Sequence, residues 1–269
     1  MKVKYRYVFV VLVYKNIEVL KDFFLFLKTD NYKVIVVNSF YDAPSLKECK
    51  EVSLANGADF IPIENKGYGY GNNIGVEYAM EHYNYDYLIL SNSDIHIKDL
   101  DVLSSFDEGA AVIAPYIHLP AGKVQNPNIP WRIPFLFRAL KLSYDNNWKF
   151  LLLFTHIVTR TCRELFKLYG IIVKRSCYKI YSCHGSFIIF TKEAVNLLRP
   201  PFNDKMFLYN EELYLAENCR LKGVPIFYCP SIDVLHLEGA SSGGFNGFER
   251  NKESYHILYE WMKENNIIR

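Results

Sequence analysis

The chain has 269 residues, of which 50% are hydrophobic and 22% are charged, and its formal net charge at pH 7 is +2. This composition is ordinary for a globular protein, so it excludes a disordered chain and gives no reason to expect a nucleic-acid partner. No apolar stretch approaches the roughly 18 residues that a membrane-spanning helix needs. The six cysteines (Cys49, Cys162, Cys177, Cys183, Cys219 and Cys229) contain no CxxC pair. We therefore expect reduced thiols in a cytoplasmic protein rather than a zinc site.

β-Branched apolar runs alternate with helical periodicity in the N-terminal part of the chain. They predict strands at 7–13, 33–37, 60–63 and 85–90, and helices at 18–27, 45–56 and 72–83. The apolar run near the N-terminus lacks a small-residue cleavage site, so we interpret it as a buried strand and not as a signal peptide. Alternation of this kind predicts a parallel sheet, which binds ligands at the carboxyl ends of its strands.

Residues 131–175 differ from the rest of the chain in charge. They contain nine Lys/Arg and two Asp/Glu, whereas the remainder has 22 basic and 27 acidic residues. Basic residues that alternate with Trp, Phe and Leu at helical spacing are typical of an amphipathic helix on an anionic membrane. A pair of helices that packs on the sheet and leaves a solvated basic rim explains the pattern equally well.

A segment rich in Gly and Asn, residues 64–75, lies between a predicted strand and a predicted helix. Its glycines permit positive φ, and the helix that follows offers free N–H groups to anionic oxygen. The spacing matches neither GxGxxG nor a P-loop. Taken alone, the segment is explained by a tight turn.

Asn92, Ser93 and Asp94 follow an apolar strand. Alternate residues of an extended segment point the same way, so Asn92 and Asp94 are expected to face one hard cation through oxygen. An Asx turn or a helix N-cap is the commoner explanation of such a sequence.

Two further motifs carry ionisable groups. Glu211 and Glu212 begin a predicted helix, where the helix dipole favours acidic residues and where one carboxylate can also face a cleft as a general base. His236 ends a late strand, a position at which a histidine is more often structural than functional.

In this order, the motifs resemble those of the family 2 inverting glycosyltransferases with the GT-A fold, and in particular the rhamnosyltransferase-like enzymes that build bacterial surface polysaccharides. The shared motifs span nearly the whole chain. They are Tyr14-Lys15-Asn16, the segment from Asn65 to Gly75, Asn92-Ser93-Asp94, Gly185-Ser186 before an apolar strand, Tyr209-Asn210-Glu211-Glu212, and His236 with Ser241 beyond it.

The resemblance implies an α/β GT-A fold with a mixed, mainly parallel central sheet flanked by helices. It implies one domain over residues 1–269, divided into a nucleotide-binding half (1–115), a basic aromatic helical segment (116–180), an acceptor and catalytic half (181–245) and a C-terminal helix (246–269). The expected location is the cytoplasm, either free or peripheral on the inner face of the cell membrane.

The resemblance also implies roles for individual residues. Glu212 is expected to be the base and Glu211 to tune it, while Asp94 and His236 hold Mg²⁺ or Mn²⁺. The expected nucleotide-sugar-binding residues are Tyr14, Asn16, Asn38, Asn65, Gly67, Gly71, Asn72, Asn73, Asn92, Ser93, Gly185 and Ser186. The donor is expected to be UDP-, dTDP- or GDP-linked, and the acceptor a glycan or lipid-linked glycan of capsule or O-antigen assembly.

Two positions depart from the family pattern. Asn38 replaces the usual Asp of the second strand, and Glu212 replaces the Asp of the usual Glu-Asp pair. These changes leave open a nucleotide-sugar-binding partner protein without efficient catalysis. A sugar nucleotidyltransferase is a second alternative, although residues 10–16 lack the glycine that such an enzyme uses near its first strand.

Overall fold

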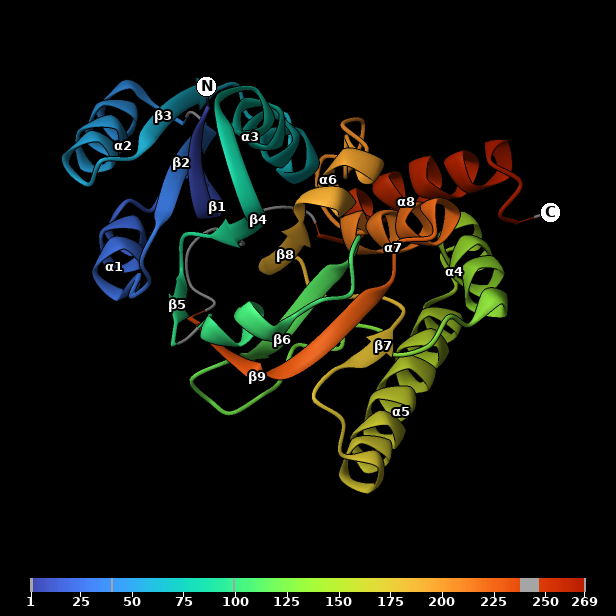
Figure 1. Ribbon diagram of the computed structural model, residues 1–269. Coiled ribbons are helices and arrows are strands. Elements are labelled where there is room, and N and C mark those ends of the chain that lie inside the picture. Colours follow the sequence, from blue (N-terminus) through green and yellow to red (C-terminus); the bar gives the residue numbers. More distant parts are fainter. Residues whose placement is uncertain (1, 40, 99, 238–246, 269) are drawn as a thin grey trace.

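The computed structural model describes residues 2–39, 41–98, 100–237 and 247–268 (Figure 1). Their strands form one nine-stranded sheet of order β3-β2-β1-β4-β8-β6-β9-β5, and β7 pairs with β9. The N-terminal strands are β1 (Val3–Val13), β2 (Tyr32–Ser39), β3 (Asp59–Ile63) and β4 (Tyr83–Asn92), and all their pairings are parallel. The predicted parallel arrangement of this half is confirmed, with each strand longer than its sequence pattern indicated.

The other strands make the sheet mixed. They are β5 (Ile95–Ile97), β6 (Val112–His118), β7 (Tyr178–Ile180), β8 (Phe187–Thr191) and β9 (Ile226–His236). β8 runs antiparallel to β4 and β6, whereas β6 and β9 are parallel. This is the mixed, mainly parallel sheet that the family resemblance implied.

Helices cover both faces of the sheet, which explains why β1 is apolar at consecutive positions. Phe9 and Val11 face a core with α1 (Glu18–Phe26) and α2 (Ala43–Ala55), while Val8 and Val10 face α3 (Tyr68–His82), α6 (Lys192–Leu198) and α7 (Glu211–Lys222). Successive side chains of a strand point to opposite faces, so one strand serves both cores. A short 3₁₀ helix, η1 (Asp101–Ser105), precedes β6.

The start of α3 corrects the prediction. The helix was expected to begin at Asn72, but it begins at Tyr68, so the Gly-rich segment forms its first turns rather than an open loop. A Cβ atom added at Gly71 would lie 2.5 Å from Leu12 Cδ1, and one added at Gly75 would lie 2.2 Å from Val10 Cγ1. These glycines therefore let α3 approach the sheet closely.

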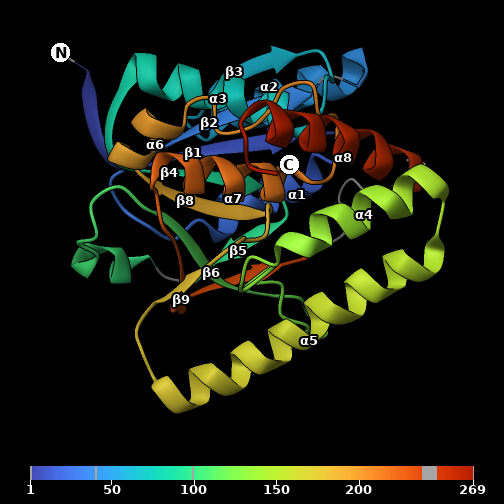
Figure 2. The ribbon, with the colours of Figure 1, turned by 90° about the vertical axis from the view of Figure 1, so that its right-hand side faces the viewer.

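The basic middle segment forms two helices, α4 (Pro134–Asn146) and α5 (Lys149–Val173). Figure 2 shows α5 as a long rod at the edge of the molecule, joined to α4 by a tight turn, with α8 (Gly247–Glu264) close to α4. None of the described helices is long and apolar enough to cross a membrane.

The expectation of reduced cysteines is wrong for one pair. Cys177 and Cys229 are joined by a disulfide that connects the segment before β7 to β9, while Cys49, Cys162, Cys183 and Cys219 are free. The two residues are 52 positions apart in the sequence, so their spacing gave no sign of the pairing.

Candidate active site

Residues from two distant parts of the chain meet where β4 ends. Asp94 lies in the turn between β4 and β5, and His236 is the last residue of β9. The antiparallel pairing of β5 with β9 places Ile95 opposite His236. Both side chains are buried, with Asp94 5% exposed and His236 also 5% exposed.

The two buried groups face each other at a distance that a cation or a shared proton can bridge. His236 Nδ1 lies 2.8 Å from Gln125 Oε1, so with a neutral ring the Nδ1–H donates to this carbonyl oxygen. His236 Nε2 then presents its lone pair to Asp94 Oδ1, 3.2 Å away. Gln125 thus fixes the ring tautomer that leaves Nε2 available as a ligand.

This arrangement suits a divalent cation. Two ligand atoms in adjacent octahedral positions, each about 2.1 Å from one Mg²⁺, lie about 3 Å apart. Within the described part of the chain, no three His, Cys, Asp or Glu side chains group together as ligands. Asp94 and His236 would therefore supply two protein ligands, and the remaining positions would be left to water and substrate oxygens.

A second group of contacts holds the Glu212 carboxylate. The backbone N–H of Gly185 donates to Glu212 Oε1 at 3.3 Å, and the hydroxyl of Tyr68 donates to the Gly185 carbonyl at 2.6 Å. A Cβ atom at Gly185 would lie 3.1 Å from Glu212 Oε1, so a side chain there would crowd the carboxylate. Tyr68, the first residue of α3, is thereby connected to the Glu212 carboxylate through the backbone of Gly185.

Burial raises the pKa of both adjacent carboxyl groups. For Glu211, loss of solvation and the nearby Glu212 raise the pKa from 4.5 to about 8, and Oε1 of this buried side chain has no hydrogen-bond partner. Loss of solvation also raises the pKa of Glu212, and backbone N–H groups partly offset the rise at both side chains, those of Glu211 and Tyr209 at Glu211 and those of Glu212 and Gly185 at Glu212. Because the charge of Glu212 raises the pKa of Glu211 further, we place a single charge of the pair on Glu212.

His184 connects these two groups, although no sequence pattern singled it out. Its ring centre is 6.0 Å from that of His236, and the next residue is Gly185. Its backbone N–H donates to Asn126 Oδ1 at 2.7 Å, and its Nδ1 lies 3.0 Å from Ser186 Oγ. Burial and the neighbouring His236 lower the pKa of His184 to about 3, so its ring is neutral at pH 7.

The predicted nucleotide residues at the ends of β1 and β2 lie in different environments. Asn38 is 3% exposed, and its Oδ1 is buried without a hydrogen-bond partner, which a ligand N–H or O–H would satisfy. Tyr14 packs edge-on against Tyr41, and Lys15 Nζ lies over both rings. The backbone N–H of Asn16 donates to the Tyr14 carbonyl in the turn after β1.

The predicted residues near α3 are largely engaged with the protein itself. Asn65 Oδ1 accepts from the Gly67 N–H, and the Asn72 amide donates to the Tyr68 carbonyl. The Asn73 side-chain amide donates to the Phe202 carbonyl and accepts from the Phe202 N–H. Gly67 has a φ of +108°, and the Tyr68 N–H donates to the Phe207 carbonyl, so this segment ties α3 to the loop before α7.

The assumption that Asn92 and Asp94 share an extended segment is wrong. β4 ends at Asn92, and Ser93 and Asp94 form a turn before β5, so strand alternation does not apply to them. The Asn92 N–H instead donates to the Ser186 carbonyl, which brings two of the predicted motifs together. Ser241, which the resemblance placed beyond His236, lies outside the described residues.

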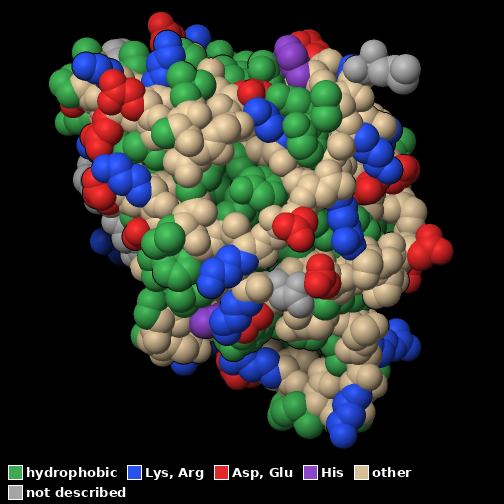
Figure 3. All heavy atoms as spheres, turned by 60° about the vertical axis from the view of Figure 1, so that its left-hand side comes forward, with side chains coloured by type: hydrophobic (Ala, Val, Ile, Leu, Met, Phe, Trp, Pro, Cys, Tyr) green, Lys and Arg blue, Asp and Glu red, His purple; other side chains and the backbone are tan. Residues whose placement is uncertain are grey.

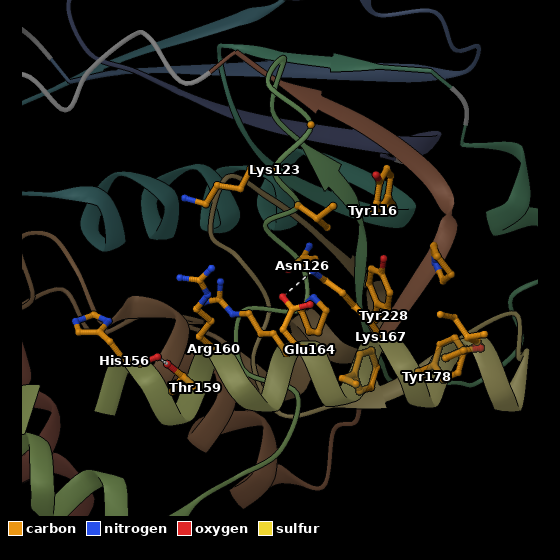
Figure 4. Close-up of a pocket in the computed structure, with 18 residues that line it drawn as sticks. Tyr116, Lys123, Asn126, His156, Thr159, Arg160, Glu164, Lys167, Tyr178 and Tyr228 are labelled. Carbon is orange, nitrogen blue, oxygen red and sulfur yellow. Dashed lines mark hydrogen bonds and ion pairs between the residues drawn. The ribbon is translucent and has the colours of Figure 1, made fainter. Parts of the chain in front are cut away.

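A cavity of about 910 Å³ lies next to this site, between α5 and the strands β6 and β9 (Figure 4). Asn126, which holds the His184 backbone, lines it. In Figure 4, Arg160 extends from α5 toward the loop that carries Lys123. The cavity therefore combines a basic side with an aromatic side of Tyr116, Tyr178 and Tyr228.

Comparison with known proteins begins with sequence. No family model matches the chain. The rhamnosyltransferase WbbL of Escherichia coli (strain K12) is 29% identical over 220 residues, which cover 77% of this chain and 73% of WbbL.

Solved structures resemble the chain over most of its length. GalNAc-T7, in a crystal structure with UDP, GalNAc and Mn²⁺, gives a TM-score of 0.62 at 11% identity and matches 95% of this chain. The mannosyltransferase PcManGT from Pyrobaculum calidifontis, in complex with GDP-Man and Mn²⁺, gives a TM-score of 0.55 at 10% identity and matches 97% of this chain. S. aureus TarS 1-349, in complex with UDP-GlcNAc, gives a TM-score of 0.53 at 12% identity and matches 89% of this chain. The chain spans 48%, 65% and 61% of these three proteins, and at such identities the similarity establishes the shared fold.

Proposed function

From the premise that this chain is a family 2 glycosyltransferase with the GT-A fold, we propose that it transfers a sugar from a nucleoside diphosphate to an acceptor hydroxyl with inversion, with the help of Mg²⁺ or Mn²⁺. One observation carries the proposal. The Asp94–His236 pair and the Glu212 carboxylate, which are far apart in the sequence, are joined through the short segment His184-Gly185.

Asp94 and His236 would hold the cation, which when bound neutralises charge on the diphosphate leaving group. The buried pair suits this role because the two groups present acceptor atoms to each other and Gln125 fixes the histidine ring. The pair also supplies few ligands, so binding of the cation is expected to depend on the donor diphosphate.

Glu212 would accept the proton of the acceptor hydroxyl as that oxygen attacks the anomeric carbon. Its raised pKa makes it a stronger base than an exposed glutamate, and the Gly185 N–H holds its carboxylate in place. Glu211 would remain protonated at pH 7 because its pKa is about 8. Direct attack opposite the leaving group inverts the anomeric centre.

The ends of β1 and β2 would bind the nucleotide. Asn38 offers a buried acceptor that has no partner within the protein, and Tyr14 with Tyr41 offers aromatic surface at the end of β1. Asn16, Asn65, Asn92, Ser93 and Ser186 would border the same pocket. Because their side chains serve the protein's own contacts, Asn72 and Asn73 would act by fixing α3 rather than by touching the donor.

The substrate classes are proposed from the relatives. UDP, dTDP and GDP are the candidate nucleotides, and the name of the rhamnosyltransferase relative favours a deoxyhexosyl donor. The acceptor would be a glycan or lipid-linked glycan of a bacterial surface polysaccharide, and the enzyme would then act in the cytoplasm against the inner membrane. Within one domain, residues 1–115 would bind the nucleotide and residues 181–245 the acceptor.

The first experiment is a thermal-shift panel of UDP-, GDP-, dTDP- and CMP-sugars with and without Mn²⁺. A ligand that binds only the folded state raises the melting temperature. We expect a Mn²⁺-dependent rise with one nucleotide, followed by NMR of the product to show the inverted anomer. A shift without transfer to any acceptor would indicate a nucleotide-sugar-binding partner protein, and a retained anomer would reject the assignment of Glu212 as base.

A further inference from the structure

Helix α5 exposes an apolar face that no described part of the chain covers. Among the described residues, 13 of the 20 exposed large apolar side chains lie between Trp131 and Ile172. On α5 they recur at helical spacing, and their exposed fractions are high: Phe150 67%, Leu153 60%, Ile157 55%, Leu168 56%, Ile171 67% and Ile172 80%. Single exposed apolar residues are normal in proteins, but a continuous face of this kind marks an interaction surface.

A basic stripe runs along one edge of this face. Lys149, Arg160 and Lys167 are spaced by 11 and 7 residues, which returns each to the same side of a helix with 3.6 residues per turn, and Lys174 follows at the C-terminal end of α5. Arg160 and Lys167 also line the cavity beside the candidate active site, so the stripe borders that cavity (Figure 4).

Opposing negative charge is scarce on α5. Glu164 is the only carboxylate in its sequence, and Lys167 neutralises it at 2.8 Å. The face of the molecule shown in Figure 3 differs from α5 in its charge distribution, because acidic and basic side chains are interspersed across it. Two tryptophans, Trp131 and Trp148, are 40% and 44% exposed near α4 and the start of α5, and tryptophan is enriched where proteins meet the membrane–water interface.

We propose that α5 docks the enzyme on an anionic lipid bilayer, with its apolar face in the interface and its basic stripe at the lipid phosphates. The charge pattern favours this partner over a second copy of the chain. A symmetric contact between two copies would bring basic stripes together with almost no carboxylates to offset them. An anionic bilayer supplies the complementary charge along the whole helix.

Docking of this kind would also orient the active site. α5 forms one wall of the cavity that Asn126 connects to His184, so the cavity would lie close to the lipid headgroups. The inference deepens the proposed function, since it states where a lipid-linked acceptor would approach. It does not depend on donor binding, so the two can be tested separately.

The test is sedimentation of the full chain with vesicles of phosphatidylcholine, alone or mixed with phosphatidylglycerol, at low salt. We expect binding to the mixed vesicles and at least about a tenfold loss with the double variant Ile157→Glu/Leu168→Glu, because it places charge on the apolar face. The matched control is Leu25→Glu/Leu54→Glu, which changes two apolar side chains on α1 and α2 that are at least as exposed (69% and 56%). This control is expected to bind like the wild type.

A second double variant isolates the charge. Arg160→Gln/Lys174→Gln is expected to weaken binding to the mixed vesicles by about tenfold or more, since each basic residue near an anionic surface contributes roughly a fivefold factor. Thermal unfolding of each variant checks that it is folded, and Mn²⁺-dependent donor binding is expected to stay unchanged in the apolar-face variant.

Three results would overturn the inference. One is wild-type binding by the apolar-face variant, and another is an equal loss in the Leu25/Leu54 control. The third is a wild-type chain that does not bind the mixed vesicles and instead forms a dimer in solution, with the double variant Ile157→Glu/Leu168→Glu remaining a monomer. Vesicle binding without any donor binding would instead support docking and reject the proposed function.

Discussion

The backbone N–H of Gly185 donates a hydrogen bond to Glu212 Oε1 at 3.3 Å. The contact holds one oxygen of Glu212 in place, whereas Oε1 of the adjacent, buried Glu211 has no hydrogen-bond partner. In its proposed role as general base, Glu212 needs a carboxylate oxygen at a defined position, and the Gly185 N–H would hold it there.

Replacement of Glu212 by Gln should remove transfer while donor binding is retained. The amide keeps the shape of the side chain but cannot accept the hydroxyl proton, so a decrease in kcat of at least about 100-fold is expected. Glu212→Asp shortens the side chain but keeps the carboxylate, and it should recover part of the activity. In the wild type, kcat/KM should rise with pH up to the raised pKa of Glu212. A large loss of donor affinity in Glu212→Gln would assign this residue to binding instead.

Asp94→Asn and His236→Gln should each weaken Mn²⁺-dependent donor binding by at least about tenfold, because each removes one of two proposed ligands. Titration of Mn²⁺ at fixed donor concentration measures the effect. A suitable control is Asp145→Asn, since Asp145 forms a comparable pair with His256 at 2.8 Å on α4 and α8, remote from the site. Unchanged Mn²⁺ dependence in both site variants would reject the proposed ligands.

Tyr68→Phe should lower kcat more than it changes the KM for the donor. Its hydroxyl donates to the Gly185 carbonyl at 2.6 Å, so its loss frees the turn that holds Glu212. The stability loss should be about 1–2 kcal/mol, typical of a buried hydrogen bond whose acceptor is left unpaired. The pH profile of kcat/KM should shift as well, which a purely structural role would not cause. An unshifted pH profile of kcat/KM would show that Tyr68 has a structural role only.

Glu211→Gln should stabilise the protein at alkaline pH. The folded-state pKa of Glu211 is about 8 and its ordinary value is 4.5, so between these values the folded state binds more protons than the unfolded state. The free energy of unfolding therefore falls as pH rises from about 4.5 to 8. Because glutamine does not ionise, Glu211→Gln should raise the free energy of unfolding by about 2–4 kcal/mol at pH 9 and change it little at pH 4. Urea unfolding at the two pH values tests this, with the exposed Glu81→Gln as a control.

Gly75→Ala and Gly170→Ala should have opposite effects, although both glycines are helical. At Gly75 the new Cβ atom would lie 2.2 Å from Val10 Cγ1, and such overpacking should cost about 1–3 kcal/mol. At Gly170 the nearest atom, Tyr178 Oη, would be 3.8 Å away, so the higher helix propensity of alanine should stabilise by up to about 1 kcal/mol. Equal effects in chemical denaturation would contradict the close packing of α3 on β1.

The sequence by itself determined the alternation of strands and helices. Apolar β-branched runs such as Val8–Val13 and Val34–Val37 have strand periodicity and propensity, which are local properties of the chain. The positions of Asp94, Glu212 and His236 near the ends of helices and strands could also be predicted from the sequence, because polar residues that interrupt apolar runs mark such ends.

Only the tertiary structure decided which of these residues meet. Asp94 and His236 are brought together by the β5–β9 pairing, and Cys177 and Cys229 by the neighbouring β7–β9 pairing. His184 became a candidate only because its ring lies near His236, and the first turns of α3 are helical because Gly71 and Gly75 allow close packing on the sheet. Such contacts depend on long-range strand pairing and on burial, and neither is encoded in the spacing of residues along the chain.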